Sequence, residues 1–130
     1  IVYSPALVKP HVDEKLTNQI DLAPTLLGLM NLDYTSRFMG YDINKVAPNN
    51  NRAFISTYQD MGYIKHDTLV ILSPRQGIDM YKTNFLNGTN VKIPVNEKLK
   101  NEAIAWYQGA GFLFKSGKYA NVSKEISKIN

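Results

Sequence analysis

The chain has 130 residues, 44% of them hydrophobic and 20% charged, and 15 Lys and Arg against 11 Asp and Glu give a formal net charge of +4. These values are typical of a packed globular domain and argue against disorder or a coiled coil. The absence of cysteine excludes disulfides and thiolate metal sites. The basic residues are spread along the chain apart from a late cluster of Lys115, Lys118, Lys124 and Lys128, which lacks base-reading companions, so we predict no nucleic-acid partner.

The chain opens on a short β-branched and aromatic run. Ile1 to Tyr3 predicts a buried strand that ends at Ser4-Pro5. Because the sequence starts inside this strand, we expect it to be a segment of a longer protein. The polar run from Lys9 to Lys15 contains Pro10 and predicts a loop.

An amphipathic helix is predicted next. Four apolar residues recur at i, i+4, i+7 and i+8, so they should share one buried face: Leu22, Leu26, Leu29 and Met30. Asn31 is expected to end this helix.

The start of this helix is predicted at Asp21. Its carboxylate would accept hydrogen bonds from the free amides of the first turn, which accounts for Asp21 as a capping residue rather than a catalytic one. Pro24 would lie in the first turn, where its missing N–H is not needed. Thr17 is the alternative cap, one turn earlier.

The pattern then changes to that of an antiparallel meander. His66-Asp67 predicts a tight hairpin turn, and the segment from Ser73 to Gly77 predicts another. Four strands are expected, at residues 53–58, 62–65, 68–73 and 77–82.

A long helix should cover one face of this sheet. It is predicted from Asn96, as N-cap, to Ser116, with Gly117 as its stop, because apolar residues repeat at helical spacing: Leu99, Ala103, Trp106, Ala110 and Leu113. Gly109 and Gly111 imply a close approach to a neighbouring element or a break. The predicted fold class is α+β, a two-layer α/β sandwich of a four-stranded antiparallel sheet and a C-terminal helix, preceded by one strand and one helix.

No arrangement of reactive residues is enforced by spacing. His11 and His66 are the only histidines, and we expect both in exposed turns rather than in a metal site with the nearby carboxylates Asp13, Glu14 and Asp67. A Ser56, His66 and Asp67 triad lacks the Gly-x-Ser-x-Gly turn that would present its nucleophile.

Tyrosines on the meander leave a second interpretation open. Tyr58, Tyr63 and Tyr81 could bind carbohydrate through flat aromatic faces, although cross-strand packing explains the same residues. The alternative function is therefore a free-standing, non-catalytic module that binds glycan or protein.

Two motifs resemble a known family. The run QIDLAPTLLGLMNL carries Asp-x-x-Pro-Thr, and a Phe-x-Gly-x-Asp loop follows it; the matching residues are Asp21, Pro24 and Thr25, then Phe38, Gly40 and Asp42. The chain resembles the C-terminal part of the sulfatase-like alkaline phosphatase superfamily, closest to lipoteichoic acid synthase-type phosphoglycerol transferases.

This resemblance implies metal-dependent attack on a sulfate or phosphate ester, with a divalent ion such as Mn, Mg or Ca in the parent enzyme. The family's Asp-His metal pair precedes the first strand, and Ser73-Pro74-Arg75 lacks the spacer of the sulfatase motif. We therefore assign no catalytic, cofactor-binding or metal-binding residue to this chain.

The resemblance also implies an organisation. Residues 1–47 would supply the C-terminal strand, loop and helix of a sulfatase-like catalytic domain, residues 48–120 a sheet-plus-helix subdomain, and residues 121–130 a flexible tail. The expected partners are the upstream catalytic domain of the same polypeptide and the parent's ester substrate. The expected location is the cell envelope, on its periplasmic or extracellular face, with an upstream membrane anchor.

Overall fold

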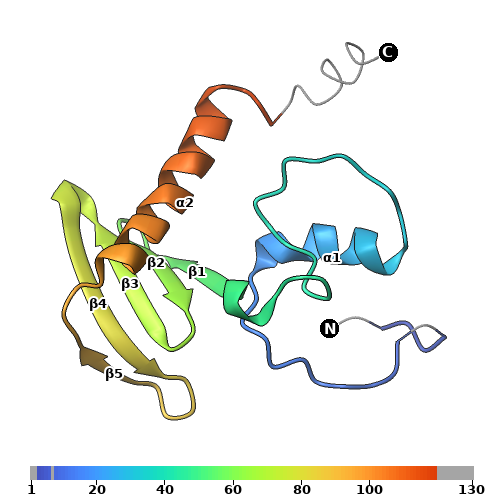
Figure 1. Ribbon diagram of the computed structural model, residues 1–130, viewed down its shortest axis with the longest axis horizontal. Helices are drawn as coiled ribbons and strands as arrows, with labels where there is room; N and C mark the ends of the chain where they lie inside the picture. The colour runs from blue at the N-terminus through green and yellow to red at the C-terminus, as the bar shows by residue number, and fades with distance from the viewer. Residues whose placement is uncertain (1–2, 7, 120–130) are drawn as a thin grey trace.

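The structure, a computed structural model, describes residues 3–6 and 8–119. Its centre is one antiparallel sheet in the order β1-β2-β3-β4-β5, with one face crossed by helix α2 (Figure 1). The strands are β1 (Arg52–Ser56), β2 (Met61–Lys65), β3 (Thr68–Ser73), β4 (Gly77–Asn84) and β5 (Thr89–Lys92). The α+β class and the meander are thus confirmed.

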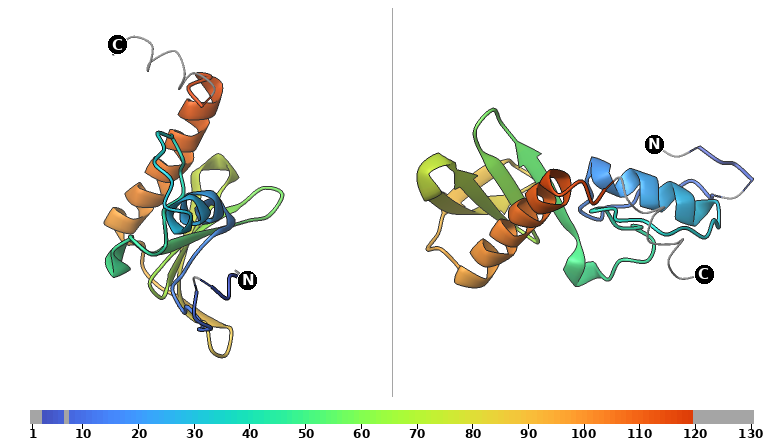
Figure 2. Two further views of the ribbon diagram at one scale, coloured as in Figure 1. Left: turned by 90° about the vertical axis from the view of Figure 1, so that its right-hand side faces the viewer. Right: turned by 90° about the horizontal axis from the view of Figure 1, so that it is seen from above.

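Within residues 3–6 and 8–119, two α-helices and three short 3-10 helices accompany the sheet. They are η1 (Gln19–Asp21), α1 (Leu22–Leu29), η2 (Pro48–Asn50), η3 (Pro74–Gln76) and α2 (Glu97–Lys115). Helix α1 lies beyond the β1 edge of the sheet, at the end of the molecule away from β5 (Figure 2). Among the described residues, neither α-helix combines the length and apolar character that a bilayer crossing needs.

The core lies between α2 and the sheet. The strand register places Tyr63, Val70 and Met80 side by side, and these three side chains are buried beneath Ala103 of α2. Residues that alternate with them along each strand point to the other face, on which no helix of the described part of the chain lies (Figure 1). This geometry explains why a small alanine is needed at the point of closest approach.

The limits of α2 follow the predicted signals. Asn96 caps the helix, because its side-chain oxygen accepts a hydrogen bond from the backbone N–H of Leu99 at 3.1 Å. The helix ends before Gly117, which has a φ of +64°. However, α2 runs unbroken through Gly109 and Gly111, and a Cβ at either position would meet nothing within 4 Å. The predicted break or close approach is therefore wrong: these glycines face open space.

The sheet has five strands rather than the four predicted. Strand β5 follows a turn containing Gly88, at a φ of +72°, and it pairs only with β4. All of its residues are exposed, so they show no alternation of apolar and polar side chains. An edge strand that is held by backbone hydrogen bonds alone cannot be predicted from the spacing of its apolar residues.

The strand predicted at Ile1 to Tyr3 is not found at Tyr3, the one of its residues that the structure describes. Ile1, Val2 and the predicted tail at residues 121–130 lie outside the described residues, and Tyr3 is exposed and not in a strand. A strand at Tyr3 would need a neighbouring strand, and the sheet within the described residues ends at β1.

The predicted burial of one α1 face is also wrong for this chain. Leu22, Leu26, Leu29 and Met30 are all exposed. The buried side of α1 is instead the opposite one, which carries Pro24 and Thr25, and the Thr25 hydroxyl bonds to the loop that follows the helix.

A prediction follows from the tight packing under α2. Ala103→Leu should destabilise the chain by about 1–3 kcal/mol, because the added carbons must displace the fully buried side chains of the sheet. Ala105→Leu, on the exposed side of the same helix, is the matched control and should leave stability nearly unchanged. Urea unfolding would measure both; equal midpoints for the two variants would contradict this account of the core.

Candidate functional site

The Asp21 motif is organised differently from the prediction. The residue that caps the turn is Asn18, whose side chain accepts from the N–H of Ile20 and whose own N–H donates to Asp21 Oδ2 at 2.9 Å. Helix α1 begins directly after this 3-10 turn, with no side-chain cap of its own. Asp21 occupies the N-cap position of α1 and Thr17 does not, but the predicted cap hydrogen bond is not made, because the Asp21 carboxylate is turned toward a cation.

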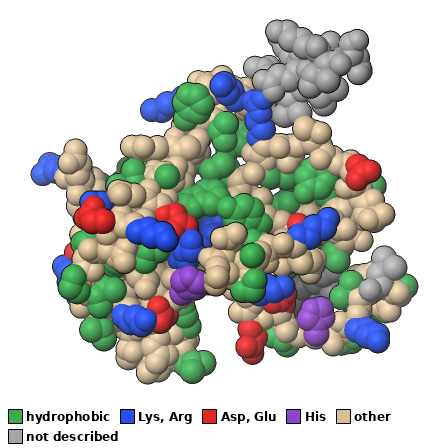
Figure 3. All heavy atoms as spheres, in the orientation of Figure 1, with side chains coloured by type: hydrophobic (Ala, Val, Ile, Leu, Met, Phe, Trp, Pro, Cys, Tyr) green, Lys and Arg blue, Asp and Glu red, His purple; other side chains and the backbone are tan. Residues whose placement is uncertain are grey.

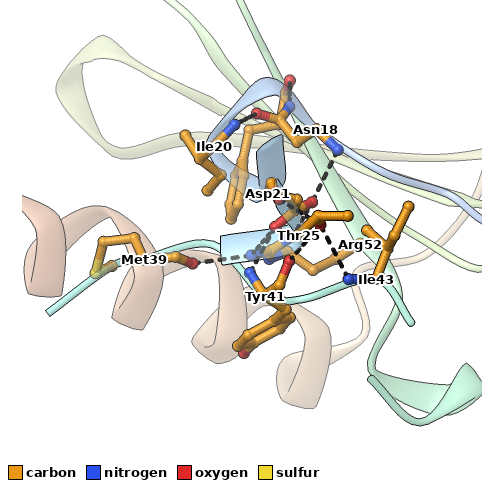
Figure 4. A network of polar contacts seen from close by, with 9 residues as sticks. Asn18, Ile20, Asp21, Thr25, Met39, Tyr41, Ile43 and Arg52 are labelled. Carbon is orange, nitrogen blue, oxygen red and sulfur yellow. Dashed lines mark hydrogen bonds and ion pairs between the residues drawn. The ribbon is translucent and has the colours of Figure 1, made fainter. Parts of the chain in front are cut away.

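That cation is Arg52, the first residue of β1. Its two terminal nitrogens donate to both Asp21 oxygens, with N–O distances of 3.0 to 3.1 Å (Figure 4). Arg52 is 2% exposed and Asp21 3%. A buried, forked guanidinium–carboxylate pair holds its partners in one geometry, because each charge left alone would be strongly disfavoured by the loss of water.

The same pair holds the loop before β1. The N–H of Tyr41 donates to Asp21 Oδ1 at 2.8 Å, and Arg52 donates to the carbonyl of Met39 at 2.9 Å. Between them, Gly40 packs so closely that a Cβ there would lie 1.8 Å from the carbonyl oxygen of Ile20. Only glycine allows this approach.

Thr25 and Gly28 join α1 to the same loop. The Thr25 hydroxyl donates to the carbonyl of Asp21 at 2.6 Å and accepts from the N–H of Ile43 at 3.2 Å. One turn on, a Cβ at Gly28 would lie 2.1 Å from a carboxylate oxygen of Asp42. The Asp-x-x-Pro-Thr and Phe-x-Gly-x-Asp motifs thus form one packed unit.

Three aromatic rings enclose Arg52. Its guanidinium carbon lies 4.3 Å from the ring centre of Tyr41, 4.9 Å from that of Trp106 and 5.2 Å from that of Phe54. Trp106 also meets Phe54 edge to face, with ring centres 5.4 Å apart. Cation–π contacts therefore connect the loop, β1 and α2 around one charge.

This centre is suited to positioning rather than to chemistry. The Asp21 oxygens are already bound to Arg52 and to two backbone N–H groups. Its residues do not fit a divalent ion, since metal binding at Asp21 would require breaking the buried pair. Across residues 3–6 and 8–119, no group of three or more His, Cys, Asp or Glu side chains is placed to hold a metal.

The histidines are not brought to the centre. His11 is exposed, with its Nδ1 2.9 Å from the carbonyl of Lys9. His66 lies in the β2–β3 turn, and Ser56 lies at the other end of the β1–β2 ladder, opposite Met61. With a rise of about 3.3 Å per residue, Ser56 and His66 are roughly 16 Å apart, too far for a triad.

The tyrosines do not form a platform. Tyr63 is buried under α2, Tyr58 is fully exposed in the β1–β2 turn, and Tyr81 pairs with Leu69 on the opposite face of the sheet. The arrangement required by the glycan-binding alternative is therefore not found in these residues.

A second polar cluster lies where β2 meets α2. Tyr63 Oη donates to Glu102 Oε1 at 2.7 Å, and Lys65 Nζ donates to the same oxygen at 2.5 Å. Burial and the hydrogen bond to Glu102 raise the pKa of Tyr63 well above its usual range. Partial burial alone would raise the pKa of Glu102, but the hydrogen bonds from Lys65 and Tyr63 outweigh it, and that pKa lies below its ordinary value.

An apolar hollow of about 510 Å³ adjoins the Arg52 centre. Figure 3 shows hydrophobic side chains gathered there, between α2 and the loop before β1. Arg37 on this loop donates to the carbonyl of Lys118 at 2.6 Å, which ties the loop to the end of α2. Residues that line the hollow include Phe38, Met39, Phe54, Met61, Trp106 and Ala110.

No family model matches the chain. A solved structure does, with a TM-score of 0.81 and 29% sequence identity: a protein in the alkaline phosphatase superfamily from Vibrio parahaemolyticus. The chain is similar to that protein. The match covers 86% of this chain but 28% of the other, so the chain spans little more than a quarter of that protein's length.

Sequence reasoning missed Arg52. It precedes the apolar run Ala53-Phe54-Ile55, where it is easily taken for a solvated strand end. The available signal was weak: an arginine directly before a buried strand, in a chain whose strongest motif contains an aspartate. The pairing spans 31 residues, and no local periodicity encodes a contact of that kind.

The buried pair makes a testable prediction. Arg52→Met should destabilise the chain by about 3–5 kcal/mol, because it leaves the Asp21 charge buried without its partner. The double variant Asp21→Asn with Arg52→Met should lose clearly less than the sum of the two single changes. Lys82→Met is the control, because its ion pair with Asp67 is half exposed and should matter little. Urea unfolding gives all four values; additive losses would contradict a coupled pair.

The Glu102 cluster predicts a pH dependence. Because the folded-state pKa of Glu102 is lowered, its stabilisation is present above its unfolded pKa of about 4.3 and is lost as the pH falls through the folded value. Glu102→Gln should therefore flatten the fall in stability with acidification, whereas Glu97→Gln, at an exposed position, should not. Urea unfolding measured across the acid range tests this; identical profiles for wild type and Glu102→Gln would refute it.

Proposed function

We propose that this chain is the C-terminal part of a metal-dependent enzyme of the alkaline phosphatase superfamily that hydrolyses or transfers a sulfate or phosphate ester. The observation that carries the proposal is the structural similarity, at 29% identity, over 86% of the chain. The finer assignment, to a sulfatase or a lipoteichoic acid synthase-type phosphoglycerol transferase, rests on the two motifs, which pack into one unit.

In this proposal the chain is a support and contributes no catalytic or metal-binding residue. The upstream catalytic domain of the same polypeptide holds the ester substrate and a divalent ion such as Mn, Mg or Ca. When bound, that ion would neutralise charge on the transferred group. The described residues shape the rim of the cleft through the loop at Met39 to Tyr41, which the Arg52–Asp21 pair holds in place.

The proposed location is the cell envelope, on the periplasmic or extracellular face, with the membrane anchor in an upstream segment. This part of the proposal depends on the resemblance to phosphoglycerol transferases.

The proposal predicts that the longer protein is active on esters and that the 130-residue chain alone is not. The longer protein that contains this chain should turn over p-nitrophenyl phosphate, bis(p-nitrophenyl) phosphate or p-nitrophenyl sulfate with added Mn²⁺, Mg²⁺ or Ca²⁺, and EDTA should abolish the activity. The 130-residue chain alone should match a blank of buffer and metal.

Either half of this experiment can fail. Metal-stimulated turnover by the isolated chain would show that it carries catalytic residues. Inactivity of the longer protein on all three esters, with every metal, would remove the support for an ester-processing enzyme.

A further inference from the structure

Helix α1 has no charged side chain. From Leu22 to Leu32 the sequence reads LAPTLLGLMNL, with Thr25 and Asn31 as its polar side chains. A helix on a protein surface normally carries a polar stripe, and one that is apolar on all sides is normally buried. The sequence of α1 is therefore that of an interior helix.

In this chain α1 is buried on one side only. Pro24 and Thr25 pack inward, toward the loop that follows, whereas Leu22 is 56% exposed and Met30 57%. Leu26 and Leu29 lie on the same exposed side at helical spacing. We call these four residues the α1 outer face.

The α1 outer face is held in a fixed orientation. The two hydrogen bonds of the Thr25 hydroxyl and the contact of Gly28 with Asp42 lock the inner side of the helix to the loop. Leu29 also borders a hollow of about 640 Å³, which Ile43 and the N-terminal segment around Val8 line from other sides. An ordered apolar surface needs little further ordering when it binds.

We propose that the α1 outer face docks on an apolar, uncharged surface formed by the remainder of a longer polypeptide, which buries α1 on all sides. This inference rests on the proposed function, in which the chain is one part of a longer enzyme. It adds the surface through which that part is joined to the rest.

Two observations favour this occupant. Most of the similar alkaline phosphatase superfamily protein lies outside the matched region, so its counterpart would supply ample chain to cover α1. Charge is also absent from the whole helix, whereas interfaces that form and dissociate keep a polar rim. An uncharged surface of this kind is more typical of permanent burial within one polypeptide than of an interface that forms and dissociates.

Cysteine labelling tests this without relying on activity. The chain has no cysteine, so single Leu22→Cys and Met30→Cys variants report on the α1 outer face alone once any cysteine elsewhere in the longer protein is replaced by serine. The controls are Val91→Cys on β5, 63% exposed in wild type, and Leu86→Cys in the β4–β5 turn, 99% exposed. Each is treated with a maleimide in the longer native protein and in the 130-residue chain.

In the longer protein, Leu22→Cys and Met30→Cys should react about tenfold or more slowly than the controls, because a buried thiol reacts only after local opening. In the 130-residue chain all four should react at similar rates. Labelling of the α1 variants at control rates in the longer protein would overturn the proposal. Concentration-dependent protection in the 130-residue chain would also overturn it, in favour of a second copy as the occupant.

The labelling result is independent of the ester assays. Protection of the α1 outer face in a protein that turns over no ester would retain the docking surface and reject the enzymatic proposal. Ester turnover by a protein whose α1 cysteines are labelled at control rates would retain the enzymatic proposal and reject the docking surface.

Discussion

The fold depends on one buried charge. Arg52 enters the interior at the first residue of β1, and Asp21, Tyr41, Phe54 and Trp106 are arranged around it. A guanidinium removed from water requires both a counter-charge and acceptors for its N–H groups. Asp21 supplies the counter-charge, the carbonyl of Met39 accepts from one terminal nitrogen, and the segments that carry these groups meet around Arg52 together with Trp106 of helix α2.

The close backbone packing around this pair is a consequence of the same requirement. For Met39 and Tyr41 to reach Arg52 and Asp21, the loop must pass directly over the carbonyl of Ile20, and Gly40 is the residue that permits it. The two motifs are therefore linked by geometry, although separate stretches of sequence carry them. Neither motif supplies a reacting group. The Asp-x-x-Pro-Thr motif provides the Asp21 carboxylate, and the Phe-x-Gly-x-Asp motif provides a loop backbone that can approach it.

The parts of the fold that the sequence predicted are those set by local chemistry. The three hairpins from β1 to β4 follow alternation and turn residues, and α2 follows its cap at Asn96 and its stop at Gly117. Strand β5 was not predicted, because it buries no side chain and so shows no hydrophobic alternation. The helix at Leu22 was found, but its buried face was assigned wrongly, because periodicity identifies an apolar stripe without showing what lies against it.

The candidate site was predicted less well than the fold. Asp21 was recognised as important and assigned the role of a cap, which a local reading of any aspartate before a helix favours. Its true partner lies 31 residues away, and nothing in the intervening sequence signals the contact. Likewise, Glu102 was not singled out, because its partners Tyr63 and Lys65 come from a strand that only the folded chain brings near.

The sheet and the Arg52 centre also differ in how they can form. Each strand pairs with its neighbour in sequence, so the meander can assemble from short-range contacts, as hairpins do on the microsecond timescale. The links that attach the N-terminal third span 31 residues from Asp21 to Arg52 and 81 from Arg37 to Lys118. Closing such long loops carries a larger entropic penalty. From this connectivity we expect assembly to start at the hairpins and to finish with the enclosure of the arginine.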